Sequence, residues 1–327
     1  MPTTNRSGDA LSEKQSGGSL EFAAPRYWPV WIGLGLCWLL HMLPFRLQLY
    51  FGGLLGRGFY YIRAKYRRIT RSNIDVCFPE WSEEQKTQCV HDHFKSIGMS
   101  LPEVAYAWWA SEKRLHALDV VEGLEHLEAA RAPGCGVILL AAHFTTLEIA
   151  GVLLGVFNGP IDAFYRPPRN KLLDKVMREG RSRASECLIP SNDFRAAIRS
   201  LREGRTIWYA FDQHLKQAKG SMMVSFFGKP SLTHPALRTL AKRTGAVVVP
   251  FHSVREVGRK LRYVLRLGPA LTNFPSGDAE ADLLRLNKII EGMVRDAPAQ
   301  YLWTRDQFKH KLAEHSGAEA TSVSTSH

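Results

Sequence analysis

Two residues with the spacing of a base and its acid stand near the middle of the chain, His143 and Glu148. Residues 137–140 form an apolar run that predicts a strand, and a helix is predicted to begin two or three residues after His143. The strand would carry His143 to the carboxyl edge of a sheet, where ligand sites of open α/β sheets gather. Glu148 would lie in the first turn of the helix, where the helix dipole favours negative charge.

This arrangement predicts a general base. A carboxylate on one ring nitrogen of an imidazole fixes the tautomer and leaves the other nitrogen to accept a proton. We therefore expect Glu148 to orient His143, and His143 to take the proton from a bound alcohol. No serine or cysteine stands beside His143 in the sequence, which favours direct attack by the alcohol over an acyl-enzyme, although a nucleophile distant in the sequence stays open.

Two further polar residues follow predicted strands. Arg166 comes after a strand predicted near 162–165, so its guanidinium is expected at the same edge, to bind a lipid phosphate bidentately or to stabilise charge near a thioester. Asp212 follows the strand predicted over 206–211. It is expected to hold Arg166 or to position the acceptor, and capping of a turn is an equal alternative.

Four residues are candidates for contacts with substrate. The turn at Phe227 and Gly228 presents an apolar wall that suits an acyl channel, with core packing as an equal alternative. Arg178 and Arg181 belong to a helix predicted over 170–183. Because the net charge is +12, we expect these two cations to bind lipid phosphates or an acidic carrier, with an ordinary helix exterior as the alternative.

Metal, disulfide and cofactor chemistry are not expected. His91 and His93 stand two residues apart, so they do not share a helix face, and no supporting cluster follows them. The five cysteines are odd in number and none has C-x-x-C spacing, which argues against a disulfide framework or a zinc knuckle and fits a reducing compartment.

The elements that must position these residues alternate between strand and helix. Strands are predicted at 137–140, 162–165, 206–211, 246–251 and 261–267, with helices between most of them. This order predicts an α/β fold with a mixed, largely parallel central sheet flanked by helices. We expect one catalytic domain over 46–311 and a flexible tail over 312–327.

The N-terminal region predicts attachment to a membrane. Residues 1–24 are rich in serine, glycine and charge and predict a disordered lead-in. Residues 25–45 are predicted to form a membrane-anchoring helix, because 28–45 contains one histidine and no formal charge, with tryptophans that suit an interfacial belt. The apolar run is short for a span, and a buried core helix is the alternative.

A basic segment follows the apolar one. Residues 57–71 hold six arginines and lysines and no acid, interleaved with aromatic side chains. A basic amphipathic helix beside an apolar segment favours an anionic membrane surface, and nucleic acid is not an expected partner. The excess of cations after the anchor predicts a main domain on the cytoplasmic side.

From about residue 25 to 311 the chain resembles the lipid A late acyltransferase family of lipopolysaccharide synthesis. The matching segments are the His143–Glu148 box, Phe164–Pro167 with the family's Tyr-Arg-Pro, Trp208–His214, Phe226–Gly228, Val247–Phe251 and Ala299–Trp303. Phe211 departs from the family, which often has proline before the acid. The resemblance implies a glycerolipid-acyltransferase-like fold, a substrate contact at Tyr165 and acyl carrier protein as the donor.

The expected reaction is transfer of a fatty acyl chain from acyl carrier protein to a hydroxyl of a lipid A precursor, at the cytoplasmic side of a bacterial inner membrane. A backbone amide or Arg166 would stabilise the oxyanion. One alternative is an acyl thioesterase, in which water replaces the alcohol. An acyltransferase acting on another membrane glycolipid or phospholipid is a second, and a basic membrane-binding scaffold without catalysis is a third.

Overall fold

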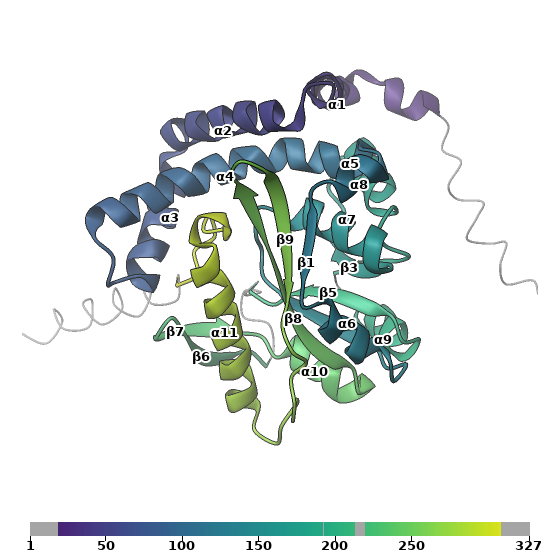
Figure 1. Ribbon diagram of the computed structural model, residues 1–327, viewed down its shortest axis with the longest axis vertical. Coiled ribbons are helices and arrows are strands. Elements are labelled where there is room, and N and C mark those ends of the chain that lie inside the picture. The colour runs from purple at the N-terminus through teal and green to yellow at the C-terminus, as the bar shows by residue number, and fades with distance from the viewer. Residues whose placement is uncertain (1–18, 192, 213–219, 309–327) are drawn as a thin grey trace, which may run out of the picture.

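The computed structural model describes residues 19–191, 193–212 and 220–308 of the 327-residue chain (Figure 1). The predicted lead-in up to residue 18 and the predicted tail over 312–327 lie outside the described residues. The strands are β1 Asp119–Glu122, β2 Val137–Ala141, β3 Ile161–Tyr165, β4 Leu188–Pro190, β5 Thr206–Ala210, β6 Met222–Phe226, β7 Lys229–Thr233, β8 Val247–Val257 and β9 Leu261–Leu267.

The helices surround the strands. They are α1 Trp28–His41, α2 Phe45–Ile62, α3 Ala64–Cys77, α4 Glu83–Trp109, α5 Glu112–His116, α6 Leu124–Arg131, α7 Leu147–Asn158, α8 Lys171–Arg181, α9 Phe194–Arg202, α10 Ala236–Thr244 and α11 Ala279–Asp296, with 3-10 turns η1 Ser19–Ala23, η2 Pro25–Tyr27 and η3 Pro298–Gln300.

The central sheet has the strand order β1-β9-β8-β2-β5-β3-β4, and β6 and β7 form a separate antiparallel hairpin. Its neighbouring strands are parallel except for β8 and β9, which are antiparallel. The predicted mixed, largely parallel sheet flanked by helices is therefore confirmed.

The core of the molecule is built around β2, whose five residues are all buried. Successive side chains of a strand point to opposite faces of the sheet. Ile138 and Leu140 accordingly pack in one apolar cluster with residues of α9, α10 and α11, and Val137, Leu139 and Ala141 in a second cluster with residues of α6 and α7. Burial on both faces explains the uninterrupted apolar run in the sequence.

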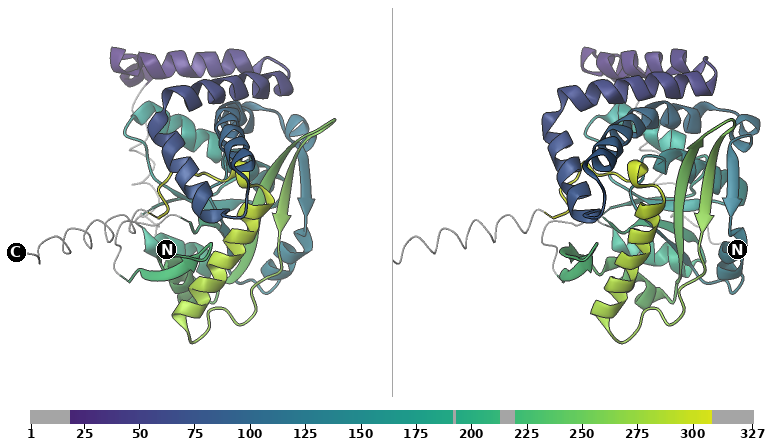
Figure 2. Two further views of the ribbon diagram at one scale, coloured as in Figure 1. Left: turned by 90° about the vertical axis from the view of Figure 1, so that its left-hand side faces the viewer. Right: turned by 60° about the vertical axis from the view of Figure 1, so that its left-hand side comes forward.

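A layer of long helices covers one end of the domain, where α1 lies above α2 and α2 lies above α4 (Figure 2). α2 and α4 touch through three glycines, Gly52, Gly56 and Gly98. A methyl group on Gly98 would overlap the backbone carbonyl oxygen of Gly52 and the amide nitrogen of Gly56. The absence of side chains here lets the two backbones approach each other closely.

Gly98→Ala is expected to destabilise the protein by about 3 kcal/mol, because the added methyl group meets backbone atoms that cannot rotate away. Gly58→Ala is the matched control. Gly58 lies in α2, and a methyl group added there would have no atom of a neighbouring element within 4 Å, so alanine should stabilise by about 0.5–1 kcal/mol. Urea unfolding of both variants measures the difference, and equal midpoints would contradict the close crossing.

The structure differs from the single membrane-anchoring helix predicted over residues 25–45. Among the described residues, no helix has both the length and the apolar character needed to cross a bilayer. The apolar run is divided, because α1 ends at His41 and a second helix begins at Phe45 after Pro44. The alternative of a buried core helix is also wrong, since His41 is the one residue of α1 that is buried.

Candidate active site

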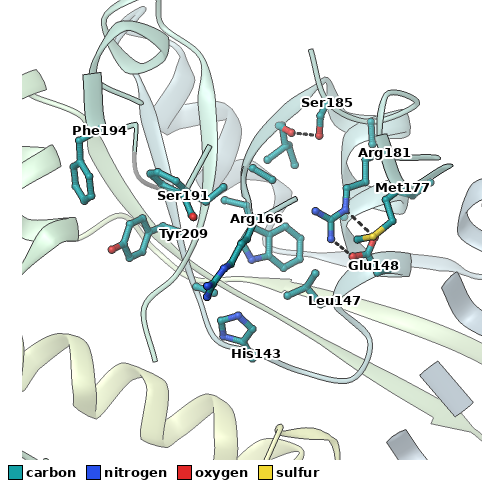
Figure 3. A pocket seen from close by; sticks show the side chains of 18 residues that line it. His143, Leu147, Glu148, Arg166, Met177, Arg181, Ser185, Ser191, Phe194 and Tyr209 are labelled. Carbon is teal, nitrogen blue, oxygen red and sulfur yellow. Dashed lines mark hydrogen bonds and ion pairs between the residues drawn. The ribbon is translucent and has the colours of Figure 1, made fainter. Parts of the chain in front are cut away.

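Three predicted site residues meet at the carboxyl edge of the sheet. His143 lies two residues beyond β2, Asp212 two residues beyond β5, and Arg166 directly after β3. β2 and β3 both pair in parallel with β5, so their carboxyl ends come to the same edge. Figure 3 shows the side chain of Arg166 extending towards the ring of His143.

The acid that holds His143 is Asp212. Its Oδ1 lies 2.7 Å from Nδ1 of the His143 ring, and its two oxygens lie 3.2 and 3.1 Å from the backbone nitrogen of His143. The carboxylate therefore accepts hydrogen bonds from both the ring and the main chain. This contact places the proton of a neutral imidazole on Nδ1 and makes Nε2 the basic nitrogen.

The charge of Asp212 is maintained by these donors. Burial by itself would raise the pKa of the Asp212 carboxyl, but the His143 imidazole and hydrogen bonds from His143 and Tyr301 hold that pKa below its ordinary value. Only 6% of the Asp212 side chain is exposed, so the ion is shielded from water and its hydrogen bonds decide its protonation state.

The prediction that Glu148 orients His143 is wrong, because Asp212 occupies that position at Nδ1. Glu148 lies in the first turn of α7 as predicted, but its carboxylate binds Arg181 at the end of α8. Arg181 Nε lies 3.1 Å from Glu148 Oε2, and Nη2 contacts Oε1 (Figure 3). The C-terminal end of α8 therefore supplies the cation that this acid binds.

The predicted pairing of Asp212 with Arg166 is wrong, because the carboxylate binds the ring and the amide of His143. Positioning of the acceptor by Asp212 stays a prediction. Pairing of β2 with β5 sets Ala141 opposite Ala210, and the amide of Phe211 donates to the carbonyl of Ala141 at 2.8 Å. The residue after Phe211 therefore faces the loop after β2. Arg166 forms no ion pair with any described residue and remains exposed at the edge of the cavity.

A cavity of about 490 Å³ opens beside His143, between α7, α8 and the sheet. Arg166, Glu148 and Arg181 contribute polar groups to its lining. Its apolar wall includes Leu147, Val152, Ile161, Met177 and Trp208. A narrow set of polar groups in a largely apolar hollow is the usual form of a small-molecule or acyl-chain site.

Sequence reasoning missed Trp208, Tyr209 and Met177 as lining residues. Trp208 and Tyr209 are inside a strand, and Met177 is inside a helix, where apolar side chains normally serve the core. Burial raises the pKa of Tyr209 above its ordinary value, so its hydroxyl stays protonated at neutral pH. Only the packing of α8 against the sheet reveals that these side chains border a hollow.

Two of the predicted substrate contacts, Tyr165 and Arg178, do not line this cavity. The hydroxyl of Tyr165 donates to Asp174, and its ring lies under the guanidinium groups of Arg178 and Arg181, each 5.5 Å from the ring centre. Arg178 itself pairs with Asp174 at 3.7 Å. Of the predicted basic pair on α8, only Arg181 therefore reaches the cavity, and there it is neutralised by Glu148.

Phe227 and Gly228 form the turn between β6 and β7, away from the cavity. Phe227 is buried, its ring centre lies 5.4 Å from that of Phe78, and its amide donates to Glu291 at 2.7 Å. Core packing, the alternative expected for this turn, is what the structure supports. Of the predicted Trp208–His214 segment, Gln213 and His214 lie outside the described residues.

His91 and His93, which stand two residues apart in the sequence, have different surroundings in the structure. His93 is fully buried, with Nδ1 3.3 Å from the carbonyl oxygen of Ala299, and burial lowers its pKa to about 4. The ring of His91 instead stacks near Tyr60. No group of three potential metal ligands occurs among the described residues.

Comparison with known proteins places the chain in a family. The family model for bacterial lipid A biosynthesis acyltransferases matches residues 15–310. The lipid A biosynthesis palmitoleoyltransferase of Escherichia coli (strain K12) is 33% identical over 292 residues, covering 89% of this chain and 94% of that protein. The lipid A biosynthesis lauroyltransferase of the same organism is 32% identical over 286 residues, covering 87% and 92%.

A solved structure is more distant. The crystal structure of the 1-acyl-sn-glycerophosphate acyltransferase PlsC from Thermotoga maritima has a TM-score of 0.34 and 17% identity, with 76% of this chain and 98% of that chain covered. The family match extends over most of the chain and includes His143, Asp212 and the residues that line the cavity beside His143. The chain belongs to the bacterial lipid A biosynthesis acyltransferase family, and it is an acyltransferase of lipid A biosynthesis.

Proposed function

We propose that this enzyme transfers a fatty acyl chain from the thioester of an acyl carrier protein to a hydroxyl of a lipid A precursor, with His143 as the general base. One observation carries the mechanism: the 2.7 Å contact between Nδ1 of His143 and Asp212, at the border of a largely apolar cavity. An acyl chain would occupy the apolar part, and the thioester carbonyl would lie beside the imidazole.

In this mechanism Nε2 of His143 takes the proton from the lipid alcohol while its oxygen attacks the thioester carbonyl carbon. Collapse of the tetrahedral intermediate breaks the carbon–sulfur bond, and the imidazolium returns its proton to the departing thiolate. Asp212 stays ionised throughout and stabilises the imidazolium. Arg166, exposed and without a carboxylate partner among the described residues, is placed to stabilise the oxyanion.

The test of this proposal separates transfer from hydrolysis. Purified enzyme is given a lauroyl thioester of acyl carrier protein, with and without a lipid A precursor, and products are identified by mass spectrometry. We expect acylated glycolipid and little free fatty acid. Hydrolysis at the same rate without acceptor would favour the thioesterase, and a phospholipid or another glycolipid as the better acceptor would change the assigned substrate.

We also propose that α1 and α2 lie on the cytoplasmic face of a bacterial inner membrane. Fifteen of the twenty exposed large apolar side chains of the described residues fall between Trp28 and Tyr66, the segment that forms α1, α2 and the start of α3. Residues 22–74 contain eight arginines and lysines and no acid, which suits anionic lipid headgroups. Because α1 and α2 run across the end of the domain, they would embed in the interface without crossing it (Figure 2).

The triple variant Ile32→Asp, Leu36→Asp, Leu39→Asp should lower binding to vesicles of phosphatidylglycerol and phosphatidylethanolamine at least about tenfold, since each position removes a membrane contact. The three residues follow one face of α1 and are 63%, 56% and 59% exposed. The matched control carries aspartates at two exposed apolar positions elsewhere, Met223 and Leu284. Co-sedimentation measures both, and equal loss from the two variants would refute this membrane surface.

A further inference from the structure

The β8–β9 hairpin extends beyond the strands on either side of it. β8 pairs with β2 up to Pro250 and continues to Val257, and β1 pairs with β9 only from Tyr263 onwards. At about 3.3 Å per residue, β8 therefore reaches about 20 Å past its pairing with β2. The tip of the hairpin lies at the end of the domain that α1 and α2 cover (Figures 1 and 2).

A side chain of α2 holds this tip. Arg46, in the first turn of α2, donates from Nη1 to the carbonyl oxygen of Arg259 at 3.1 Å and from Nη2 to the carbonyl oxygen of Gly258 at 2.8 Å. Both acceptors are uncharged, so the positive charge of the guanidinium is not neutralised by them. The turn of the hairpin is thereby fixed against one of the two helices that we place on the lipid surface.

The tip combines an exposed apolar side chain with cations. Val257 is 56% exposed, and Arg259 and Lys260 follow it at exposed positions. Neither of these cations forms an ion pair with any residue that the structure describes. The acid beside them, Glu256, stands opposite Arg262 in the antiparallel register. This part of the chain borders an open hollow of about 470 Å³ with a net positive lining.

We propose that the tip of this hairpin, residues 257–260, is a second contact with the anionic lipid leaflet. Val257 enters the interface, and Arg259 and Lys260 bind the phosphates of anionic phospholipids. The inference rests on the proposed placement of α1 and α2 on the membrane, and it extends that surface to a segment more than 200 residues later in the chain. Contacts on two separate elements restrict tilting of the domain at the membrane.

The surroundings of the tip favour lipid over an acidic protein as its partner. The tip is joined to α2, whose Leu47 and Tyr50 are exposed, and Val257 is exposed beside the cations. A lipid interface accepts apolar and cationic groups together, whereas an acidic protein surface would complement the cations alone. α9 also presents exposed cations, Arg195 and Arg199, but it lies far from α1 and α2 (Figure 1).

The experiment compares the double variant Arg259→Glu, Lys260→Glu with the matched control Arg195→Glu, Arg199→Glu of α9. Both variants replace two exposed cations by two acids, so they change the net charge equally. Co-sedimentation with vesicles of phosphatidylglycerol and phosphatidylethanolamine measures binding. We expect the hairpin variant to bind at least about tenfold more weakly than the wild type, and the α9 variant to bind within about threefold of it.

Two further measurements test the apolar contact and cover poor folding of the charge variant. Val257→Asp should weaken binding by about threefold to tenfold, whereas Met223→Asp, at a 51% exposed position of β6, should not. An environment-sensitive fluorescent amino acid at position 257 reports lipid contact with both cations still present. Its emission should shift to shorter wavelength when the anionic vesicles are added, and the same probe at position 223 should show no shift.

Three outcomes would overturn the inference. The first is equal binding of the hairpin and α9 variants to the anionic vesicles, and the second is an equal loss on phosphatidylcholine vesicles, which carry no net charge. The third is normal vesicle binding with a raised KM for the acyl carrier protein, which would assign the tip to the carrier.

The variant with aspartates at Ile32, Leu36 and Leu39 distinguishes these outcomes from failure of the proposed membrane surface of α1 and α2. If that variant loses binding and the hairpin variants do not, only the hairpin contact is lost. If neither loses binding, the placement of α1 and α2 on the membrane falls with it.

Discussion

Replacing His143 with alanine should abolish acyl transfer, with kcat lowered by about 10²–10⁴-fold, because no other group would take the proton from the attacking hydroxyl. Folding and binding to vesicles should be unchanged, since the ring lies at the border of the cavity and not in the apolar core. Steady-state rates with saturating donor and acceptor measure the loss, and circular dichroism checks the fold.

The matched control for this variant is His252→Ala. His252 also binds a carboxylate, with Nε2 2.8 Å from Oδ2 of Asp296, and its side chain is 13% exposed against 19% for His143. It lies outside the cavity lining, so its loss should leave kcat within about twofold of the wild-type value. If the His143→Ala enzyme is fully active, His143 is not the general base.

Asp212→Asn should lower kcat by about 10²–10⁴-fold with a modest effect on folding. Asparagine has nearly the same shape, but its amide carries no charge to stabilise the imidazolium and can turn an N–H towards Nδ1, which favours the wrong tautomer. The carboxylate that lies 2.7 Å from Nδ1 belongs to Asp212, so the large effect is expected at this position.

Glu148→Gln distinguishes the role of Glu148 from that of Asp212. Its expected effect on kcat is about tenfold or less, and it should act through Arg181, whose guanidinium would lose its partner in a largely apolar cavity. The double variant Glu148→Gln, Arg181→Gln restores charge balance and should recover part of any loss. If Glu148→Gln lowers kcat as far as Asp212→Asn, Glu148 takes part in proton transfer and the assignment of Asp212 as the sole orienting acid is wrong.

Local patterns predicted the elements and the edge where the site lies. The strand expected over 261–267 is β9, and those expected at 137–140, 162–165 and 206–211 differ from β2, β3 and β5 by one residue. The strand predicted at 246–251 runs on to Val257 as β8. Alternation of burial and the apolar character of central strands are properties of short segments, so periodicity reveals them.

Short or half-buried strands were harder to predict. β1 and β4 contain four and three residues, and neither is among the strands that the sequence predicts. β1 is held as an edge strand by its parallel pairing with β9, which lies more than 140 residues later in the chain. The four residues of β1 alone therefore give no sign of the strand with which they pair.

By itself, the sequence determined the fold class, the edge that carries His143, Arg166 and Asp212, and the family. Only the tertiary structure decided which acid holds the imidazole, that Glu148 binds Arg181, and that α1 is exposed along most of its length. The physical reason is that strand ends and apolar periods depend on neighbours along the chain. Hydrogen-bond and ion-pair partners depend on which strands and helices pack together.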